Sequence, residues 1–424
     1  MTQSTQNKNY TLPIAMMFAL FFMIAFVTGL PSPMGVIVAK QFGATNFESQ
    51  LGFLGNFLAY AFMGIPAGIM LKKFGYKITA LAAIAVGFVG VGIQFFSGQV
   101  GFFSVYLAGA FVSGFSMCML NTVVNPMLNT LGGGGNKGNQ LIQFGGSINS
   151  IGATITPMLV GWLMGAAAGR TIEKANPALF LAMGIFVLAF VVLYFVNIPE
   201  PHMESAAERK VKQPHSPLSF RHFIFGAIAI FIYVGIEIGI PSTANLFMTG
   251  STSASNAGLG IEATTAGGIV GVYWLLMLVG RLTGASIGAK VSSKTMMIAV
   301  SSLGLILILA AILSPTSIII TLPYFGTQVP LSIVFLVICG LCTSIMWGGV
   351  FNLAVEGLGK YTAAGAGIFM VMVCGGGIVP LIQGWFSDHF GYLNSYWVMF
   401  ACLAYMLWYA LVGCKNVNKD IPVE

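Results

Sequence analysis

The chain has 424 residues, of which 57% are hydrophobic and only 7% charged, and its formal net charge is +7. A water-soluble globular core stops growing near ~250–300 residues and still needs a polar exterior, so a soluble domain is excluded for most of this chain. The sequence therefore predicts an all-α integral membrane protein. Its positive charge is explained by basic residues collected on one side of the membrane, as described below, so no nucleic-acid partner is expected.

Apolar segments run along almost the whole sequence, and twelve are long enough to cross a hydrocarbon layer of ~30 Å as helices of about 20 residues. Alternating apolar and polar segments of about 10 residues, which indicate a membrane β-barrel, do not occur. In chain order the predicted spans are 12–39, 50–71, 76–97, 101–131, 141–168, 177–198, 222–249, 264–290, 294–313, 331–356, 362–386 and 392–413.

One long polar interruption, from Pro199 to Arg221, separates the sixth span from the seventh. It predicts an N-terminal six-helix bundle over 1–198, a central loop over 199–221 and a C-terminal six-helix bundle over 222–424. The two halves also repeat each other at an offset of 223 residues. The repeat joins Gly152, Pro157, Gly161 and Trp162 to Gly375, Pro380, Gly384 and Trp385.

Basic residues fall mainly on one side of the predicted membrane. Fourteen of the 18 Lys and Arg residues lie in the two tails and the even-numbered connections, including Arg209, Lys210 and Lys212. Because cytoplasmic loops collect basic residues, both termini are expected to be cytoplasmic. No cleavable secretory signal is expected, since the first apolar stretch is too long for one.

Four segments resemble the fucose/glucose–galactose:cation symporter family of the major facilitator superfamily. They are Asn121 to Gly132, Asn139 to Pro157, Tyr233 to Glu237, and Ser344 to Pro380. The resemblance implies two pseudo-symmetric six-helix bundles, a substrate site near the membrane midplane between them, and a bacterial inner-membrane sugar symporter. Secondary transporters of this kind work by rocking one half against the other.

Two positions depart from that family. Proton-coupled members carry acids in the first and fourth helices, at positions that correspond here to about Gly29 and Asn121. Neither residue can titrate, so the family's proton pathway does not transfer directly, and Na⁺ becomes a more attractive coupling ion.

Glu237 lies near the middle of the seventh span. A charge at mid-bilayer costs roughly 2.5–3.5 kcal/mol on insertion scales and usually faces a cavity or a partner. Glu237 is therefore the leading candidate for the coupling residue. The alternative is a structural acid that bonds to a neighbouring helix.

Three further charged residues are expected to have structural or gating roles. Glu356 and Lys360 are four residues apart at the end of the tenth span, a spacing that favours an ion pair on a helix. Arg281 lies in the eighth span within snorkelling reach of the interface. An anion-binding role for Arg281 stays open and would favour an acidic sugar.

Neutral polar and aromatic residues inside the spans predict the substrate pocket. Buried amides must find partners, and they offer both donors and acceptors to sugar hydroxyls. Flat rings stack on the apolar faces of sugars. Helix–helix hydrogen bonding or simple packing is the alternative for each. The candidates are Asn121, Asn125, Gln143, Asn149, Asn245, Tyr273, Trp274, Trp347, Asn352 and Gln383.

These features predict uptake of a neutral hexose such as glucose, galactose, mannose or fucose by symport with H⁺ or Na⁺. The alternatives are an amino or acidic sugar such as N-acetylglucosamine or sialic acid, or a sugar sensor that does not transport. No nucleophile, base and acid constellation indicates an enzyme, and no metal site or cofactor is expected. The expected partners are the sugar, the coupling cation and the bilayer, and the expected state is a monomer.

Overall fold

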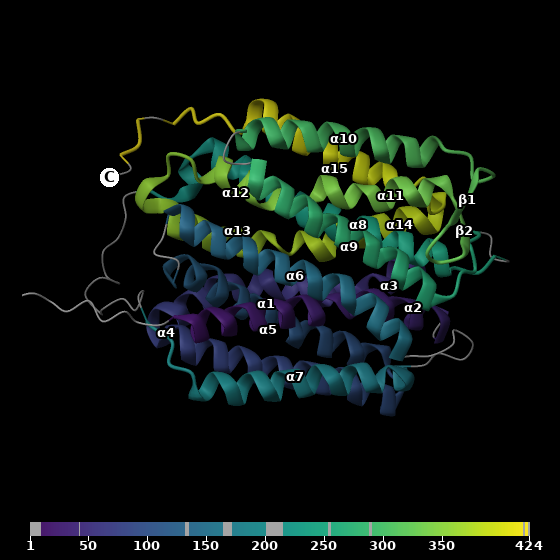
Figure 1. The fold of residues 1–424 in the computed structure, drawn as a ribbon, viewed down its shortest axis with the longest axis horizontal. Helices are drawn as coiled ribbons and strands as arrows, with labels where there is room; N and C mark the ends of the chain where they lie inside the picture. The colour runs from purple at the N-terminus through teal and green to yellow at the C-terminus, as the bar shows by residue number, and fades with distance from the viewer. Residues whose placement is uncertain are drawn as a thin grey trace, which may run out of the picture.

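The chain forms a bundle of long helices that lie roughly along one direction (Figure 1). The structure is a computed structural model that describes residues 10–41, 43–131, 135–163, 172–200, 215–252, 256–287, 291–418 and 420–422. Helices α1 to α7 pack together on one side of the bundle, and α8 to α15 pack together on the other (Figure 1).

The first half contains seven α-helices and one short 3₁₀ helix among the described residues. They are α1 (Thr11–Gly29), α2 (Pro31–Gln41), α3 (Asn46–Ser49), α4 (Leu51–Val100), α5 (Phe103–Leu131), α6 (Gly135–Leu163), η1 (Ile172–Ala175) and α7 (Asn176–Phe195).

The second half adds a small antiparallel hairpin that the sequence reasoning did not predict. Its β1 residue Ile319 pairs with Pro330 of β2. The elements are η3 (Pro217–Ser219), α8 (Arg221–Thr249), α9 (Ala263–Ile287), α10 (Ser293–Leu313), β1 (Ile319–Leu322), β2 (Thr327–Pro330), α11 (Leu331–Thr343), α12 (Met346–Val355), η4 (Gly359–Tyr361), α13 (Thr362–Met372), α14 (Gly375–Phe390), α15 (Tyr396–Trp408) and η5 (Tyr409–Gly413).

Eleven helical stretches within the described residues are long and apolar enough to cross a membrane. They correspond to eleven of the twelve predicted spans. The remaining span, 141–168, corresponds to α6, which is long enough at 29 residues but is less apolar because of its amides, hydroxyls and glycines. α6 packs along α1 and α9, and its Ser147, Ser150 and Thr156 side chains are buried.

Several predicted spans differ from simple rods. The second and third spans, together labelled α4, are two helices joined at Gly75, whose non-helical φ of 82° only glycine adopts readily. The tenth span is broken between α11 and α12, and the eleventh between α13 and α14. Ser344, Ile345 and Val373, at these two breaks, line the central cavity. Broken helices in transporters commonly mark the substrate site.

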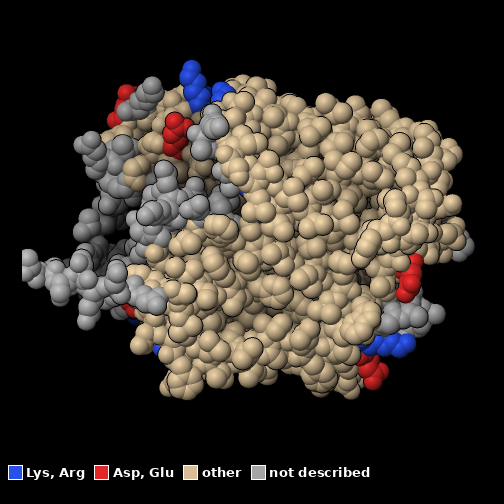
Figure 2. Space-filling model, in the orientation of Figure 1, with Lys and Arg blue, Asp and Glu red and all other residues tan. Residues whose placement is uncertain are grey.

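The two ends of the bundle are distinguished by the elements that lie there. The hairpin end carries β1, β2 and α3, whereas the terminal end carries the start of α1 and the end of η5 (Figure 1). Charged side chains in the face that Figure 2 shows lie at these two ends, with an uncharged band between them. Large apolar side chains such as Ile69, Phe195 and Ile306 are exposed on the outside of the bundle, as expected for a surface that faces lipid.

The internal repeat is visible in the contacts of equivalent glycines. Gly152 of α6 packs against α1, and Gly375 of α14 packs against α8, so each lies against the first long helix of its own half. Gly161 of α6 instead contacts Thr264 of the opposite half, and Gly384 of α14 contacts Asn46 of the opposite half. Small residues at these points let the two halves approach closely.

Close helix packing gives a direct stability prediction at Gly114 in α5. A methyl group at Gly114 would overlap the carbonyl oxygen of Asn56 in α4. We expect Gly114→Ala to destabilise the protein by about 1–3 kcal/mol, the usual cost of overpacking. The matched control is Gly184→Ala in α7, where the added carbon meets no atom within 4 Å. Thermal unfolding in detergent checks both, and equal melting temperatures would contradict the packing argument.

Candidate functional site

A cavity of about 840 Å³ lies between the two halves of the bundle. The first half lines it with α1, α4, α5 and α6, and the second half lines it with α8, α9, α10, α12 and α13. Polar atoms contribute a substantial part of its wall, although it lies among apolar helices. This arrangement suits a polar solute that contacts both halves at once.

The cavity extends toward the terminal end of the bundle. Its lining includes Ser286 near the end of α9, Ser293 at the start of α10 and Asn352 near the end of α12. At the hairpin end the halves instead touch each other. Gln50 donates to Ser242 Oγ across the halves at 3.3 Å, and Thr264 donates to the Gly161 carbonyl at 3.4 Å. The described structure therefore has the cavity reaching the terminal end, with contact between the halves at the hairpin end.

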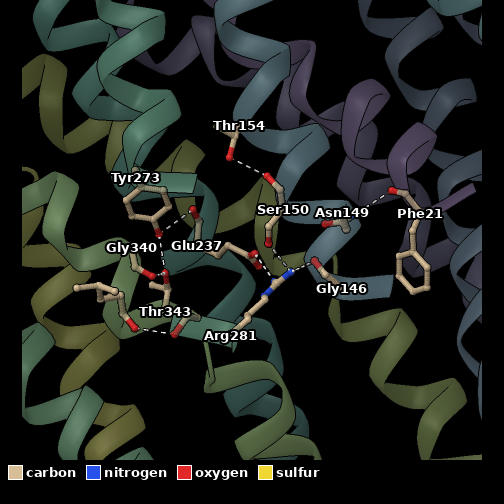
Figure 3. Close-up of polar contacts among 12 residues, drawn as sticks. Phe21, Gly146, Asn149, Ser150, Thr154, Glu237, Tyr273, Arg281, Gly340 and Thr343 are labelled. Atoms are coloured by element: carbon tan, nitrogen blue, oxygen red, sulfur yellow. Dashed lines mark hydrogen bonds and ion pairs between the residues drawn. The ribbon is translucent and has the colours of Figure 1, made fainter. Parts of the chain in front are cut away.

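Glu237 and Arg281 form an ion pair in the cavity wall (Figure 3). Arg281 Nη2 lies 3.4 Å from Glu237 Oε1, and the two side chains are 14% and 16% exposed. A guanidinium stays charged at physiological pH and neutralises the carboxylate beside it. Pairing therefore lowers the cost of holding these two charges among membrane-spanning helices.

Arg281 also joins the two halves. Its Nη1 donates to the carbonyl oxygen of Gly146 at 2.7 Å and to Ser150 Oγ at 2.9 Å, both on α6 of the first half (Figure 3). Glu237 and Arg281 belong to α8 and α9 of the second half. One guanidinium thus links the carboxylate to the opposite half.

A hydrogen-bonded tyrosine supports the backbone next to this ion pair. The Tyr273 hydroxyl donates to the Glu237 carbonyl oxygen at 3.3 Å and lies 3.0 Å from Thr343 Oγ1 (Figure 3). Thr343 in turn bonds the Gly340 carbonyl of α11. Tyr273 is buried and is not among the residues that line the cavity. Its hydrogen bond to the Glu237 carbonyl oxygen stabilises α8.

Three of the four amides predicted on the fourth and fifth spans lie at the cavity. Asn121 donates to the Tyr60 hydroxyl at 2.9 Å, and Asn125 donates to the Asn121 carbonyl at 2.9 Å. Asn149 donates to the Phe21 carbonyl of α1 at 3.1 Å (Figure 3). All three residues line the cavity. Each amide oxygen can still accept from a solute, because these bonds use only the amide nitrogen.

The remaining candidates are placed differently. Trp274 and Trp347 line the cavity, and Asn352 lines it near the terminal end, 3.5 Å from Ser293 Oγ. Asn245 and Gln383 are buried inside the second half and are not among the lining residues. The backbone of Gln143 lies in α6, but its side chain is outside the described part of the structure.

Sequence reasoning missed an aromatic row on α4. Phe53, Phe57 and Tyr60 line the cavity, with ring centroids 6.4 Å and 6.0 Å apart along the row. Trp347 of the second half lines the same cavity, and its ring lies 6.2 Å from that of Tyr233. The three α4 residues recur every three or four positions, a signal that indicates a shared helix face but does not reveal what that face meets.

Glu356 and Lys360, which were predicted to pair on one helix, do not lie on one helix. α12 ends at Val355, and Gly357 has a φ of 75°, so residues 356–360 do not form a helical turn. The helical spacing on which the predicted ion pair depended is therefore absent. The Glu356 carbonyl oxygen instead lies 2.9 Å from His222 Nε2, and the Lys360 side chain is outside the described residues.

The described part of the chain contains no group of three or more His, Cys, Asp or Glu side chains that could hold a metal ion.

A helical bundle of membrane-spanning length with a polar cavity between its halves is the architecture of a membrane transporter. The sequence pattern of the Major Facilitator Superfamily matches residues 16–380. The chain belongs to this superfamily. The relatives that it matches are transporters and not enzymes.

Individual relatives cover nearly the whole chain. The glucose/galactose transporter of Brucella abortus biovar 1 (strain 9-941) is 28% identical over 421 residues, which cover 98% of this chain and 97% of that protein. The L-fucose-proton symporter of Escherichia coli (strain K12) is 22% identical over 410 residues, which cover 91% and 89%. The crystal structure of the transporter FucP in the outward conformation matches with a TM-score of 0.69 at 19% identity, covering 96% of this chain and 100% of that one.

Proposed function

We propose that this protein takes up a neutral monosaccharide, such as glucose, galactose or fucose, by symport with a cation through alternating access. The observation that supports this most directly is the cavity between the halves, where amides and aromatic rings surround one ion-paired carboxylate. The names of the two transporters compared above, each of which aligns with more than nine-tenths of the chain, favour the same substrate class.

The charge of the cavity favours a neutral sugar over an acidic one. Arg281 is engaged by Glu237 and by two oxygens of α6, so its charge is already balanced. An acidic sugar would need an unpaired cation, or it would have to displace the Glu237 carboxylate. Hydroxyls of a neutral sugar require only uncharged hydrogen-bond partners, such as the amide oxygens that Asn121, Asn125 and Asn149 place at the wall.

We propose that Glu237 couples cation movement to the change of conformation. When H⁺ or Na⁺ binds the carboxylate, Arg281 loses its Coulombic partner in α8. The guanidinium also holds Gly146 and Ser150 of the first half, so its rearrangement acts directly on the contact between the halves. Occupancy of one carboxylate would thereby bias an equilibrium between two arrangements of the bundle.

We further propose that the terminal end faces the cytoplasm of a bacterial cell, in the inner membrane. Basic residues are concentrated in the tails and in the connections on that side. The proposed division of the chain into residues 1–198, 199–221 and 222–424 follows the same arrangement, with the central loop on the cytoplasmic side.

The function is tested by uptake of labelled monosaccharides into proteoliposomes, with Na⁺ and H⁺ gradients imposed separately. We expect one neutral sugar to accumulate against its gradient under one of the two ion gradients. Failure of every neutral sugar under both gradients would contradict the proposal. Uptake of N-acetylglucosamine or sialic acid in the same assay would redirect it to an amino or acidic sugar.

Trp347 gives a prediction about substrate binding. It follows the break between α11 and α12 and lines the cavity. Aromatic stacking contributes about 0.5–1.5 kcal/mol, so we expect Trp347→Ala to raise KM about three- to tenfold with a smaller change in kcat. Trp162→Ala is the control, because Trp162 is 70% exposed on the outside of the bundle. An unchanged KM for Trp347→Ala would remove this residue from the proposed pocket.

A further inference from the structure

Asp388 of α14 reaches across the boundary between the two halves at the hairpin end. Its Oδ1 accepts the backbone N–H of Asn46 at 2.8 Å, and its Oδ2 accepts the backbone N–H of Phe47 at 2.8 Å. Asn46 and Phe47 begin α3 in the first half, and both contacts are partly buried. Both carboxylate oxygens are thus used by backbone amides of the opposite half.

Within the described part of their own half, the two amides have no acceptor, because the first N–H groups of a helix lack an intrahelical partner. α3 satisfies part of this need itself: Thr45 Oγ1 accepts the Glu48 N–H at 3.1 Å, and the Glu48 carboxylate accepts the Thr45 N–H at 2.8 Å. The Asn46 and Phe47 amides depend on Asp388. Bonds from neutral donors to a carboxylate are among the stronger hydrogen bonds.

The backbones of α3 and α14 also touch here. A carbon added at Gly384, one turn before Asp388, would lie 2.9 Å from the Asn46 carbonyl oxygen and 3.0 Å from Phe47 Cα. Asn256 holds this end of α14 within its own half by donating to the Ser387 carbonyl at 2.7 Å. The carboxylate therefore belongs firmly to one half and the amides to the other, so the contact cannot survive separation of α3 from α14.

The Asp388 carboxylate has no equivalent at the corresponding position of the first half. Gly384 has its equivalent at Gly161, and both contact the opposite half. The residue 223 positions before Asp388 is Gly165, which has no side chain to accept a hydrogen bond. Close glycine packing is therefore common to both halves, whereas the acidic acceptor is present in only one of them.

We infer that the bonds from Asp388 to the Asn46 and Phe47 amides form a latch that keeps the hairpin end closed while the cavity reaches the terminal end. When the hairpin end opens during the transport cycle, both bonds must break. Water can then hydrate the carboxylate and the two amides, which makes the latch reversible. This inference rests on the proposed function, since it assigns Asp388 to the equilibrium between the two states of an alternating-access transporter.

The test measures how fast a membrane-impermeant maleimide, added from the hairpin side, reacts with a cysteine in the cavity. Thr28→Cys places the reporter at the cavity wall in α1. Tyr324→Cys, at a hairpin position that is 87% exposed, identifies which side of the vesicle carries the hairpin. The chain without an added cysteine gives the background, since five of its six cysteines are buried and Cys402 is half-buried.

Two variants remove the latch from opposite sides. Asp388→Ala removes the acceptor. Asn46→Pro removes one donor at the first position of a helix, where proline is well tolerated, and it decides the question if Asp388→Ala does not fold. We expect Asp388→Ala to raise the labelling rate of Thr28→Cys about tenfold, and Asn46→Pro to raise it less. The double variant should not exceed the larger single effect, because both changes break the same contact.

Glu48→Gln is the matched control. It removes a carboxylate from the same end of α3 without breaking a contact between the halves. Its labelling rate should therefore stay at the reference rate, which is that of Thr28→Cys without a further change. The latch is refuted if folded Asp388→Ala and Asn46→Pro both label at the reference rate, or if Glu48→Gln labels as fast as they do. Labelling needs no substrate, so failure of every sugar in the uptake assay would count against the proposed function alone.

Discussion

Replacing Glu237 by Gln is expected to abolish gradient-driven accumulation of the sugar while leaving exchange of sugar across the membrane intact. The amide keeps the size of the carboxylate but can neither bind a proton at physiological pH nor balance the charge of Arg281. Coupling would then lose the one acidic group that lines the cavity among the described residues. We expect the accumulation ratio under an imposed ion gradient to fall to that of empty liposomes.

The control is Glu262→Gln, a change to an exposed carboxylate that precedes α9 at the hairpin end. It should accumulate sugar like the unaltered protein. Counterflow, in which unlabelled sugar inside drives entry of labelled sugar without an ion gradient, measures exchange. Concentrative uptake by Glu237→Gln would show that coupling does not require this carboxylate, and loss of counterflow as well would indicate a role in sugar binding or folding.

Replacing Arg281 by Gln is expected to cause a large loss of stability together with loss of transport. It leaves the Glu237 carboxylate without its counter-charge at a site that is only 16% exposed. Breaking one partner of a buried ion pair typically costs about 3–5 kcal/mol. It also removes the donors to Gly146 and Ser150, which join the two halves. Thermal unfolding in detergent and the uptake assay measure the two effects separately.

The double variant Glu237→Gln/Arg281→Gln separates charge balance from mechanism. We expect it to recover much of the stability that Arg281→Gln loses, because no unpaired charge remains, while uptake stays absent. Arg281→Lys keeps the charge, but a single ammonium lacks the planar fork that reaches both Glu237 and α6. A double variant as unstable as Arg281→Gln would show that the ion pair is not the main source of the stability of this site.

Much of the fold follows from local sequence signals. Runs of apolar residues predicted the membrane-spanning helices because each helix satisfies its own backbone hydrogen bonds within a single segment. The repeat of Gly161 and Trp162 at Gly384 and Trp385 predicted two related halves, and these glycines do make equivalent contacts. Local signals were less reliable where a span is broken. Nothing in the run of apolar residues through Ser344 and Ile345 indicated the interruption that places them at the cavity.

The candidate site was predictable by residue type but not by partner. Glu237 and Arg281 were singled out because charges inside a membrane are costly, and that cost depends only on the residue and its depth. Their pairing joins positions 44 residues apart, and the bond from Arg281 to Gly146 spans 135 residues. Tyr273 and Gln383 have the polar character of ligand-binding residues, yet the packing of their helices turns them away from the cavity lining.

A multi-pass helical transporter with two related halves could be inferred without a structure, because hydropathy, charge bias and internal repeats can be read along the chain. The meeting of Arg281 with Glu237 and α6, and of Asp388 with the amides of α3, became apparent only in the folded protein. These contacts depend on how distant helices rotate and pack against one another. That arrangement is set by the close fit of many side chains together, and no single stretch of sequence contains it.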